Sequence, residues 1–225
     1  MDWRFNTIWF DQLEQDQIYH KDFKTNVIET ENKIFNNSEY AIIWHLKEKI
    51  NSFDNLSEND KLSYLELNWA NIKNFDGIEK FKNLKRLELH YCVKLENDFG
   101  ISRHCENLEF LHIDMSKKFV FTDELLQLRK LKVLCLNSCG SIENLGFLKY
   151  FPYLIDFRFV DTNIIDGNLK PILEHPTIRT VGFLNKKHYN YKDEQIKIEL
   201  GNKFKNEYKT IVHKGQYSTY RYDYE

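Results

Sequence analysis

The stretch LKRLELHYC, residues 84–92, alternates leucines with charged residues and ends in a histidine, a tyrosine and a cysteine. Its leucines follow an LxxLxL frame that recurs along the chain at spacings of 22, 24, 23, 23 and 24 residues. The six frames begin at Leu62, Leu84, Leu108, Leu131, Leu154 and Ile178. A period this regular predicts one small structural unit repeated in tandem.

Each repeat has two halves with different periods. In the first half Leu65 and Leu67 flank a glutamate, and this alternation predicts a short strand with one buried face. In the second half apolar residues stand three apart, as at Ile72, Phe75 and Ile78, which is typical of a helical or 3₁₀ turn. One unit cannot bury its own apolar edge, so we expect stacked units with their strands side by side in a parallel sheet.

The segments LSYLELNWANIKNF, LKRLELHYCVKL and LKVLCLNSCGSIENL resemble the leucine-rich repeat family. The short repeat is most similar to the phosphatase-regulator-like and internalin-like classes. The resemblance covers residues 62–186 and implies an α/β fold of the solenoid type. Such a solenoid has a curved parallel β-sheet on its concave side and 3₁₀ or short helical turns on its convex side.

The chain departs from the family's pattern at one position of each repeat. The family usually has asparagine three residues after the last apolar strand position, where its side chain bonds to the backbone. Here that position holds Ala70, Cys92, Ser116, Cys139, Thr162 and Lys186. Cysteine, serine and threonine fit a small interior corner and form weak or ordinary hydrogen bonds, so we expect a looser ladder at this corner.

Four segments are expected along the chain: an N-terminal cap at 1–39, a degenerate first repeat at 40–61, six repeats at 62–186 and a C-terminal cap at 187–225. In the degenerate repeat, a register that buries Ile43 and His45 is favoured over one that buries Trp44 and Leu46. The C-terminal cap is expected to contain a helix, because apolar residues recur every four positions, followed by a hairpin, because tyrosines alternate near its end. The four-residue spacing runs through Ile196, Leu200, Phe204 and Tyr208.

Charge and composition exclude several classes of partner. The 32 lysines and arginines nearly balance the 34 acids, so the net charge of -2 gives no general attraction to nucleic acid or to anionic membranes. The N-terminal residues lack the apolar region of a signal peptide, and the apolar runs are too short to cross a membrane. A cytoplasmic protein with free thiols is therefore expected, with no nucleic-acid or membrane partner.

Histidines and cysteines raise the question of a metal site. The candidate ligands are His90, Cys92, His104, Cys105, His112, Cys135 and Cys139. No close pair of cysteines with zinc-ligand spacing occurs. The repeat places Cys92 and Cys139 in the buried corner, and it leaves Cys135 facing outward beside His112. We therefore expect no metal, no cofactor and no redox motif, and without a phosphate loop or a nucleophile elbow we expect no enzyme.

The strand residues that flank the buried pairs define a candidate protein-binding face. Aromatic side chains among carboxylates on such a face suit a basic protein partner. The expected contact residues are Tyr64, Glu66, Trp69, Glu88, His90, Tyr91, Phe110, His112, Asp114 and Arg158. In the alternative arrangement, the terminal segments fold over these aromatics.

Three functions follow from this face and from the resemblance. The first is a protein-interaction module that binds a protein ligand in its concave sheet. In its most specific form the chain is an immunity protein that occludes the basic active site of a bacterial toxin, because it resembles stand-alone bacterial leucine-rich repeat proteins found beside secreted toxins. The second is an adaptor or phosphatase-regulator-like subunit that uses the same face, and the third, least favoured, is a metal-dependent or redox enzyme.

Overall fold

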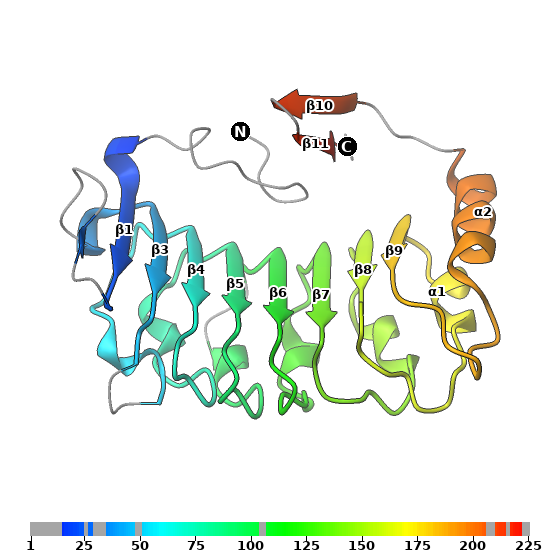
Figure 1. Cartoon of the computed structure of the whole chain (residues 1–225), viewed down its shortest axis with the longest axis horizontal. Coiled ribbons are helices and arrows are strands. Elements are labelled where there is room, and N and C mark those ends of the chain that lie inside the picture. The colour runs from blue at the N-terminus through cyan, green and yellow to red at the C-terminus, as the bar shows by residue number, and fades with distance from the viewer. Residues whose placement is uncertain are drawn as a thin grey trace.

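The computed structural model describes residues 15–24, 27–28, 35–47, 51–103, 107–205, 210–214 and 217–221. Its main feature is one sheet in the order β2-β1-β3-β4-β5-β6-β7-β8-β9 (Figure 1). All neighbouring strands pair in parallel except β2, which pairs antiparallel with β1. The parallel sheet expected from the repeat is therefore confirmed.

The strands are short, with five residues in β1 and β3–β7, three in β8 and β9 and two in β2. They are β1 (Ile18–Asp22), β2 (Val27–Ile28), β3 (Tyr40–Trp44), β4 (Tyr64–Asn68), β5 (Arg86–His90), β6 (Phe110–Asp114), β7 (Val133–Asn137), β8 (Asp156–Arg158) and β9 (Thr180–Gly182). The segments that return from one strand to the next contain 3₁₀ turns: η4 (Phe53–Asn55), η5 (Ile78–Lys80), η6 (Ile101–Arg103), η7 (Leu125–Gln127) and η8 (Gly146–Tyr150). In the segment between β8 and β9, the short helix α1 (Lys170–Glu174) replaces the 3₁₀ turn.

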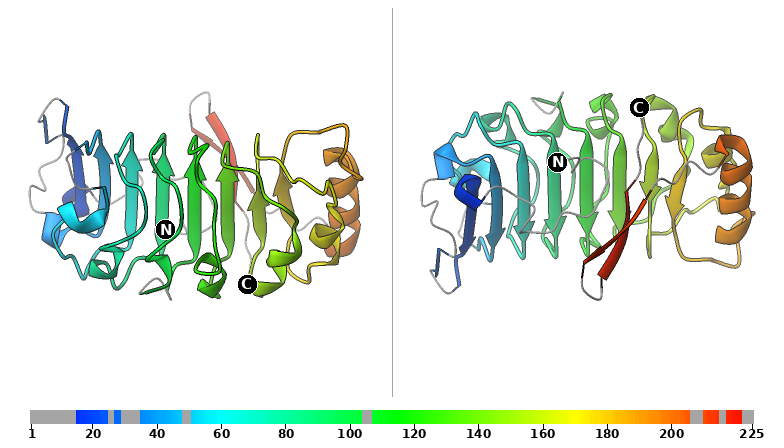
Figure 2. Two further views of the ribbon diagram at one scale, coloured as in Figure 1. Left: turned by 90° about the horizontal axis from the view of Figure 1, so that it is seen from below. Right: turned by 90° about the horizontal axis from the view of Figure 1, so that it is seen from above.

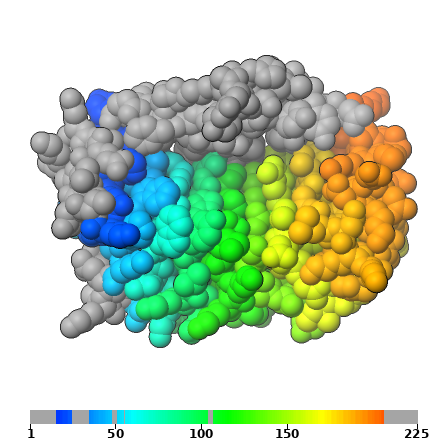
Figure 3. All heavy atoms as spheres, viewed as in Figure 1, coloured from blue at the N-terminus to red at the C-terminus, as the bar shows by residue number. Residues whose placement is uncertain are grey.

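The hydrophobic core lies between the sheet and the return segments. The two apolar strand positions of each frame point into it, and Leu65, Leu67, Leu87 and Leu89 are fully buried. Phenylalanines of the return segments close the other side of the core, with Phe53 stacked on Phe75 at 5.8 Å between ring centroids. In the space-filling view the described residues form one continuous body from the first strands to the C-terminal helix (Figure 3). The expected inward positions of the six frames are confirmed.

Strands β3 to β7 are each followed directly by a residue with a left-handed backbone, and another such residue follows three positions after β8. The positive φ angles lie between 47° and 57° at His45, Trp69, Tyr91, Met115, Ser138 and Asp161. This conformation is uncommon for residues other than glycine. Here it turns the chain out of the sheet while a backbone hydrogen bond continues to the next unit, as when the Trp69 N–H donates to the His90 carbonyl at 2.9 Å. The side chains of these residues therefore stand in one line across the molecule.

The interior corner carries hydrogen bonds that link neighbouring units. The Ser116 hydroxyl donates to the Cys92 carbonyl at 3.1 Å, and the Thr162 hydroxyl donates to the Leu136 carbonyl at 2.7 Å. The thiols of Cys92 and Cys139 make only long contacts to carbonyls, at 3.4–3.9 Å. Hydroxyl corners are thus bonded normally and thiol corners weakly.

The register expected for the first repeat is wrong. Ala41 and Ile43 form its buried pair, since they align with Leu65 and Leu67 in the sheet. His45 lies beyond the strand and Leu46 fills the corner, so neither of the two registers considered is correct. The strand is offset by 24 residues from the next one, whereas Phe53 and Phe75 are offset by 22. Two additional residues between the strand and the 3₁₀ turn absorb the difference.

The ends of the chain add further elements. Near the N-terminus, η2 (Gln15–Gln17) precedes β1 and η3 (Phe35–Asn37) precedes β3. Strand β1 was not anticipated, because the segment 1–39 contains no LxxLxL frame. After β9, helix α2 (Asp193–Phe204) packs against β9 and α1 and buries Ile196 and Leu200.

A hairpin formed by β10 (Thr210–Lys214) and β11 (Tyr217–Arg221) follows α2. It lies on the side of the sheet opposite the return segments, near β7 and β8 (Figures 1 and 2). The last residue of the four-residue spacing, Tyr208, lies outside the described residues, as does Cys105. Among the described residues, no helix combines the length and apolar character that a membrane span requires.

Candidate functional site: the outer face of the sheet

We call the side of the sheet opposite the return segments the outer face. Three parallel rows of side chains cross it because the strands pair without slippage. The first row runs through Tyr40, Tyr64, Arg86, Phe110, Val133 and Asp156, the middle row through Ile42, Glu66, Glu88, His112, Cys135 and Arg158, and the third row through Trp44, Asn68, His90, Asp114 and Asn137. A fourth row is formed by the left-handed strand-end residues.

The first row is buried, which corrects one expectation from the sequence. Tyr64 and Phe110 were expected to be exposed anchors, yet they are only 3% and 6% exposed. The Arg86 guanidinium lies between them, 5.5 Å from the Tyr64 ring and 3.8 Å from the Phe110 ring. On either side, Tyr64 packs with Ile18 and Tyr40, and Phe110 packs with a second apolar cluster. These side chains lie on the outer face but are buried, so they are not available as contacts.

The second apolar cluster contains Cys135, which was expected to face outward beside His112. It does stand on the outer face opposite His112, but it is buried with Phe110, Val133 and Ile155. Burial raises the pKa of its thiol. The corner thiols of Cys92 and Cys139 are shielded in the same way, and burial raises the pKa of each to about 12. Burial thus disfavours the thiolate, which is the reactive species, at each of these three cysteines.

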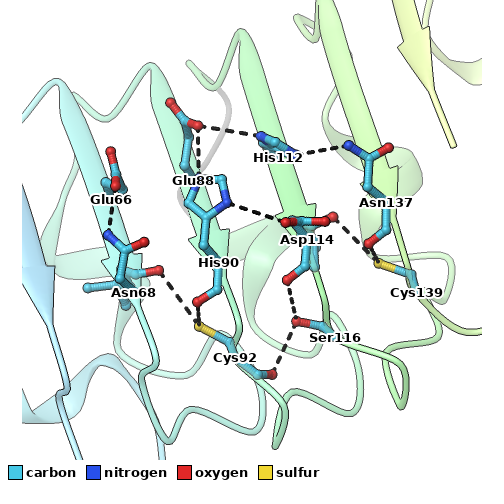
Figure 4. Close-up of polar contacts among 12 residues, drawn as sticks. Glu66, Asn68, Glu88, His90, Cys92, His112, Asp114, Ser116, Asn137 and Cys139 are labelled. Carbon is cyan, nitrogen blue, oxygen red and sulfur yellow. Dashed lines mark hydrogen bonds and ion pairs between the residues drawn. The ribbon is translucent and has the colours of Figure 1, made fainter. Parts of the chain in front are cut away.

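Glu88 is the centre of a charged network on the middle row. Its Oε1 accepts a hydrogen bond from Nε of Arg86 at 2.7 Å, and its Oε2 lies 3.1 Å from Nε2 of His90 and 3.4 Å from Nδ1 of His112 (Figure 4). Burial alone would raise the pKa of the Glu88 carboxyl, but the charge of Arg86 and the hydrogen bonds from His112 and His90 hold it well below its usual value. Glu88 is therefore a buried carboxylate with a full set of partners.

His90 responds to the same charges in the opposite direction. Burial lowers the pKa of its imidazole, but the hydrogen bond to Glu88 and the charges of Glu88, Glu66 and Asp114 outweigh this effect and raise it. Its second nitrogen, Nδ1, lies 3.9 Å from an Asp114 oxygen. The ring thus stands between two carboxylates, in a region of negative potential.

His112 is oriented by an amide on the next strand. The Asn137 Oδ1 accepts the Val160 N–H at 2.9 Å, so the amide NH₂ is the group that faces Nε2 of His112 at 3.1 Å. This assignment rests on the hydrogen-bond network, as it must for an amide. It makes Nε2 of His112 an acceptor and leaves Nδ1 to donate to Glu88.

Glu66 and Asp114 are the outer-face carboxylates without a strong cation. Glu66 accepts hydrogen bonds from the Tyr64 hydroxyl at 2.5 Å and from the Asn68 amide at 2.6 Å. Burial and the charges of Glu88 and Glu66 raise the pKa of Tyr64 well above its usual value, so its hydroxyl remains a donor. Within the described ranges, no lysine or arginine lies within ion-pair distance of Glu66 or Asp114. Arg158, by contrast, is paired with Asp156 at 2.6 Å.

The most exposed part of the face is a stack of rings on the strand-end row. The His45 and Trp69 rings are stacked at 5.4 Å, and the Trp69 and Tyr91 rings are stacked at 4.7 Å. Trp44 packs against this stack, 5.3 Å from Trp69. We call His45, Trp69 and Tyr91 the aromatic stack. Trp69 and Tyr91 remain 37% and 39% exposed, so the stack is an accessible apolar surface beside the acidic rows.

The structure shows which of the histidines and cysteines lie together. His90 and Cys92 point to opposite sides of the sheet, so they do not share a site, as expected. The sequence places Glu88, His90 and His112 on one face, but it does not show that both histidines converge on Glu88, because alternation gives no distances between side chains. The pattern that indicates this convergence is a glutamate two residues before a histidine, with a second histidine opposite that glutamate on the next strand.

Comparison with known protein-family models finds no match for this chain, and comparison with curated proteins finds none either.

Proposed function

We propose that the chain is a leucine-rich repeat solenoid whose concave side is the outer face, and that it binds a protein partner there. The aromatic stack is the observation that carries this proposal. Stacked aromatic side chains that remain accessible beside polar residues are typical of protein contact sites. A rigid sheet also holds them in place, which lowers the entropic cost of binding.

The charges of the face favour a basic partner. Glu66 and Asp114 lie close to the aromatic stack and have no lysine or arginine partner among the described residues. A lysine or arginine of a bound protein could pair with either carboxylate while the stack supplies apolar contact. The most specific form of the proposal is an immunity protein of the cytoplasm that occludes the basic active site of a toxin.

The contact surface is smaller than the sequence suggested. The residues that can touch a partner directly are Glu66, Trp69, His90, Tyr91 and Asp114. The remaining expected contacts act differently. Tyr64, Phe110 and Glu88 are buried, and His112 bonds to Glu88 and Asn137. Arg158 is the last residue of β8, where it pairs with Asp156. The partner should therefore dock over the ends of β3–β6.

Binding to a candidate toxin encoded beside this chain tests the proposal. We expect the double variant Trp69→Ala/Tyr91→Ala to weaken binding by about 1,000-fold, since two central aromatic contacts are worth about 2 kcal/mol each. Asp114→Lys should weaken it as well, through repulsion of a basic partner. Calorimetric titration of the purified pair measures both effects.

The matched control is Tyr153→Ala, which removes an aromatic ring that is 59% exposed and lies away from the outer face. It should leave the affinity unchanged. Equal affinity of the wild type and the Trp69→Ala/Tyr91→Ala variant would rule out the outer face as the contact surface.

An adaptor or phosphatase-regulator-like subunit is the second candidate, and it uses the same face. Capture from cells with the wild type and the stack variant separates the two functions. A housekeeping enzyme lost only from the variant supports the adaptor, whereas a single toxin supports immunity. We propose no catalytic role for the chain.

A further inference from the structure

Three groups that commonly bind metal ions meet on the outer face. Glu88, His90 and His112 each present one ligand atom, and these atoms lie within 4.8 Å of one another (Figure 4). The distance from Oε2 of Glu88 is 3.1 Å to His90 Nε2 and 3.4 Å to His112 Nδ1. A tetrahedral ion with bonds of about 2.0–2.1 Å separates neighbouring ligand atoms by about 3.4 Å. Two of the three separations therefore already suit one ion.

Neighbouring side chains hold the two ligands on β5 in position. Arg86 bonds to Oε1 of Glu88, which leaves Oε2 directed at the histidines. The Asp114 carboxylate lies 3.9 Å from Nδ1 of His90, the nitrogen that faces away from Glu88. A carboxylate behind a histidine ligand fixes its ring and its tautomer in many metal sites. The ligands also lie on paired strands, so little ordering is needed when an ion binds.

The charge around the cluster favours a cation. Glu66 and Asp114 flank it, and within the described ranges neither forms an ion pair with a lysine or arginine. Arg86 offsets the charge of Glu88, so these two carboxylates supply the remaining negative potential. The three ligand side chains are only 10–19% exposed, which limits competition from water.

We propose that Glu88, His90 and His112 form a binding site for one divalent transition-metal ion, with Zn²⁺ as the expected occupant. The ligand atoms are Oε2 of Glu88, Nε2 of His90 and Nδ1 of His112. Two imidazoles and one carboxylate form a donor set that suits Zn²⁺. Three protein ligands leave one position of a tetrahedral ion open. This site shares His90 with the proposed protein-binding surface, but it does not rest on that function.

Asn137 limits the affinity of this site. When Nδ1 of His112 binds the ion, Nε2 must carry the proton, yet Nε2 faces the Asn137 NH₂ group, which is also a donor. The amide cannot reverse without leaving the Val160 N–H without its acceptor. Asn137→Asp removes this conflict, because one carboxylate oxygen can accept from Val160 and the other from His112.

Titration of the metal-free full-length chain with ZnCl₂, followed by calorimetry, tests the site. We expect saturable binding of one ion per chain, and Co²⁺ in its place should give ligand-field absorption in the visible range. His90→Gln and His112→Gln should each weaken Zn²⁺ binding by at least about 10-fold. His188→Gln, which changes an exposed histidine outside the cluster, should leave it unchanged. Absence of saturable binding, or equal binding by both cluster variants and the wild type, would overturn the proposal.

The Asn137→Asp variant provides a test in the opposite direction. It should tighten Zn²⁺ binding by about 10-fold or more, as expected for a corrected partner of a ligand histidine. Circular dichroism of each variant checks that the sheet is intact, so a loss of binding cannot come from unfolding. If Asn137→Asp binds Zn²⁺ no more tightly than the wild type, His112 Nδ1 is not a ligand and the three-ligand site is wrong.

Discussion

At the scale of single residues, the outer face is organised around one buried ion pair. Glu88 and Arg86 are 10% and 4% exposed in their side chains, and each also contacts neighbours on adjacent strands. Such a pair adds little stability compared with apolar residues, but loss of one partner leaves an uncompensated buried charge. Arg86 also fills the space between two aromatic rings, so it contributes packing as well as charge.

Arg86→Met should therefore destabilise the protein strongly. We expect the free energy of unfolding to fall by about 3–5 kcal/mol, because the Glu88 carboxylate loses its main cation. The double variant Arg86→Met/Glu88→Gln should recover part of this loss, because the amide is neutral. Urea denaturation at neutral pH measures both, and a double variant less stable than Arg86→Met would contradict the argument.

At the scale of elements, the sequence predicted those strands in which the LxxLxL frame is complete. Large apolar residues at both inner positions of a strand fix which of its two faces is buried, so β4–β9 could be predicted from the sequence. The first repeat could not, because Ala41 carries a weak apolar signal while Trp44 and Leu46 carry stronger ones. Strand β1 has the sequence IYHKD, with no frame, and it is recognisable only through its pairing with β3.

The candidate site was predictable in part for a related reason. Alternation shows which side chains share a face, and it placed Glu88, His90 and Trp69 correctly on the outer face. It does not show how much neighbours bury one another, so the burial of Tyr64 and Phe110 was missed. Tyr64 and Phe110 pack with side chains of neighbouring strands and with Arg86, and no local pattern encodes these contacts.

The end of α1 offers a prediction about pH. His175 follows this helix, and its Nε2 contacts the Leu148 carbonyl at 3.2 Å while its Nδ1 accepts from the Thr177 N–H at 3.3 Å. Burial lowers the pKa of His175, the hydrogen bond to Leu148 partly opposes this, and the charge of Lys203 lowers it further. The unfolded chain therefore takes up this proton first as the pH falls.

His175 should consequently reduce stability below about pH 6.5, the ordinary pKa of histidine. Above that pH the residue is neutral in both states and its contribution is constant. We expect the difference in urea midpoint between pH 7.5 and pH 5.0 to be smaller in His175→Gln than in the wild type. The same difference in both proteins would show that His175 does not contribute.

At the scale of the whole molecule, helix α2 closes the sheet at β9. Ile196 and Leu200 point into this contact, whereas Ile198 on the same helix is 63% exposed. Ile196→Asp/Leu200→Asp should detach the helix and give concentration-dependent association, visible by light scattering after gel filtration. Ile198→Asp places one charge on the exposed side and should elute as the wild type does. Identical elution of all three proteins would show that α2 does not protect the edge.

The two-residue strand β2 closes the other end of the sheet by running against the direction of its neighbours. A stack of identical parallel units has no intrinsic length, and in principle another copy could add to either end as in a growing fibre. A strand this short has few free backbone groups for another chain to pair with, and its reversed direction does not continue the parallel pairing. Strand β2 at one end of the sheet and helix α2 at the other thus prevent the addition of further strands, and they limit a repeat that could continue indefinitely to a protein of fixed size.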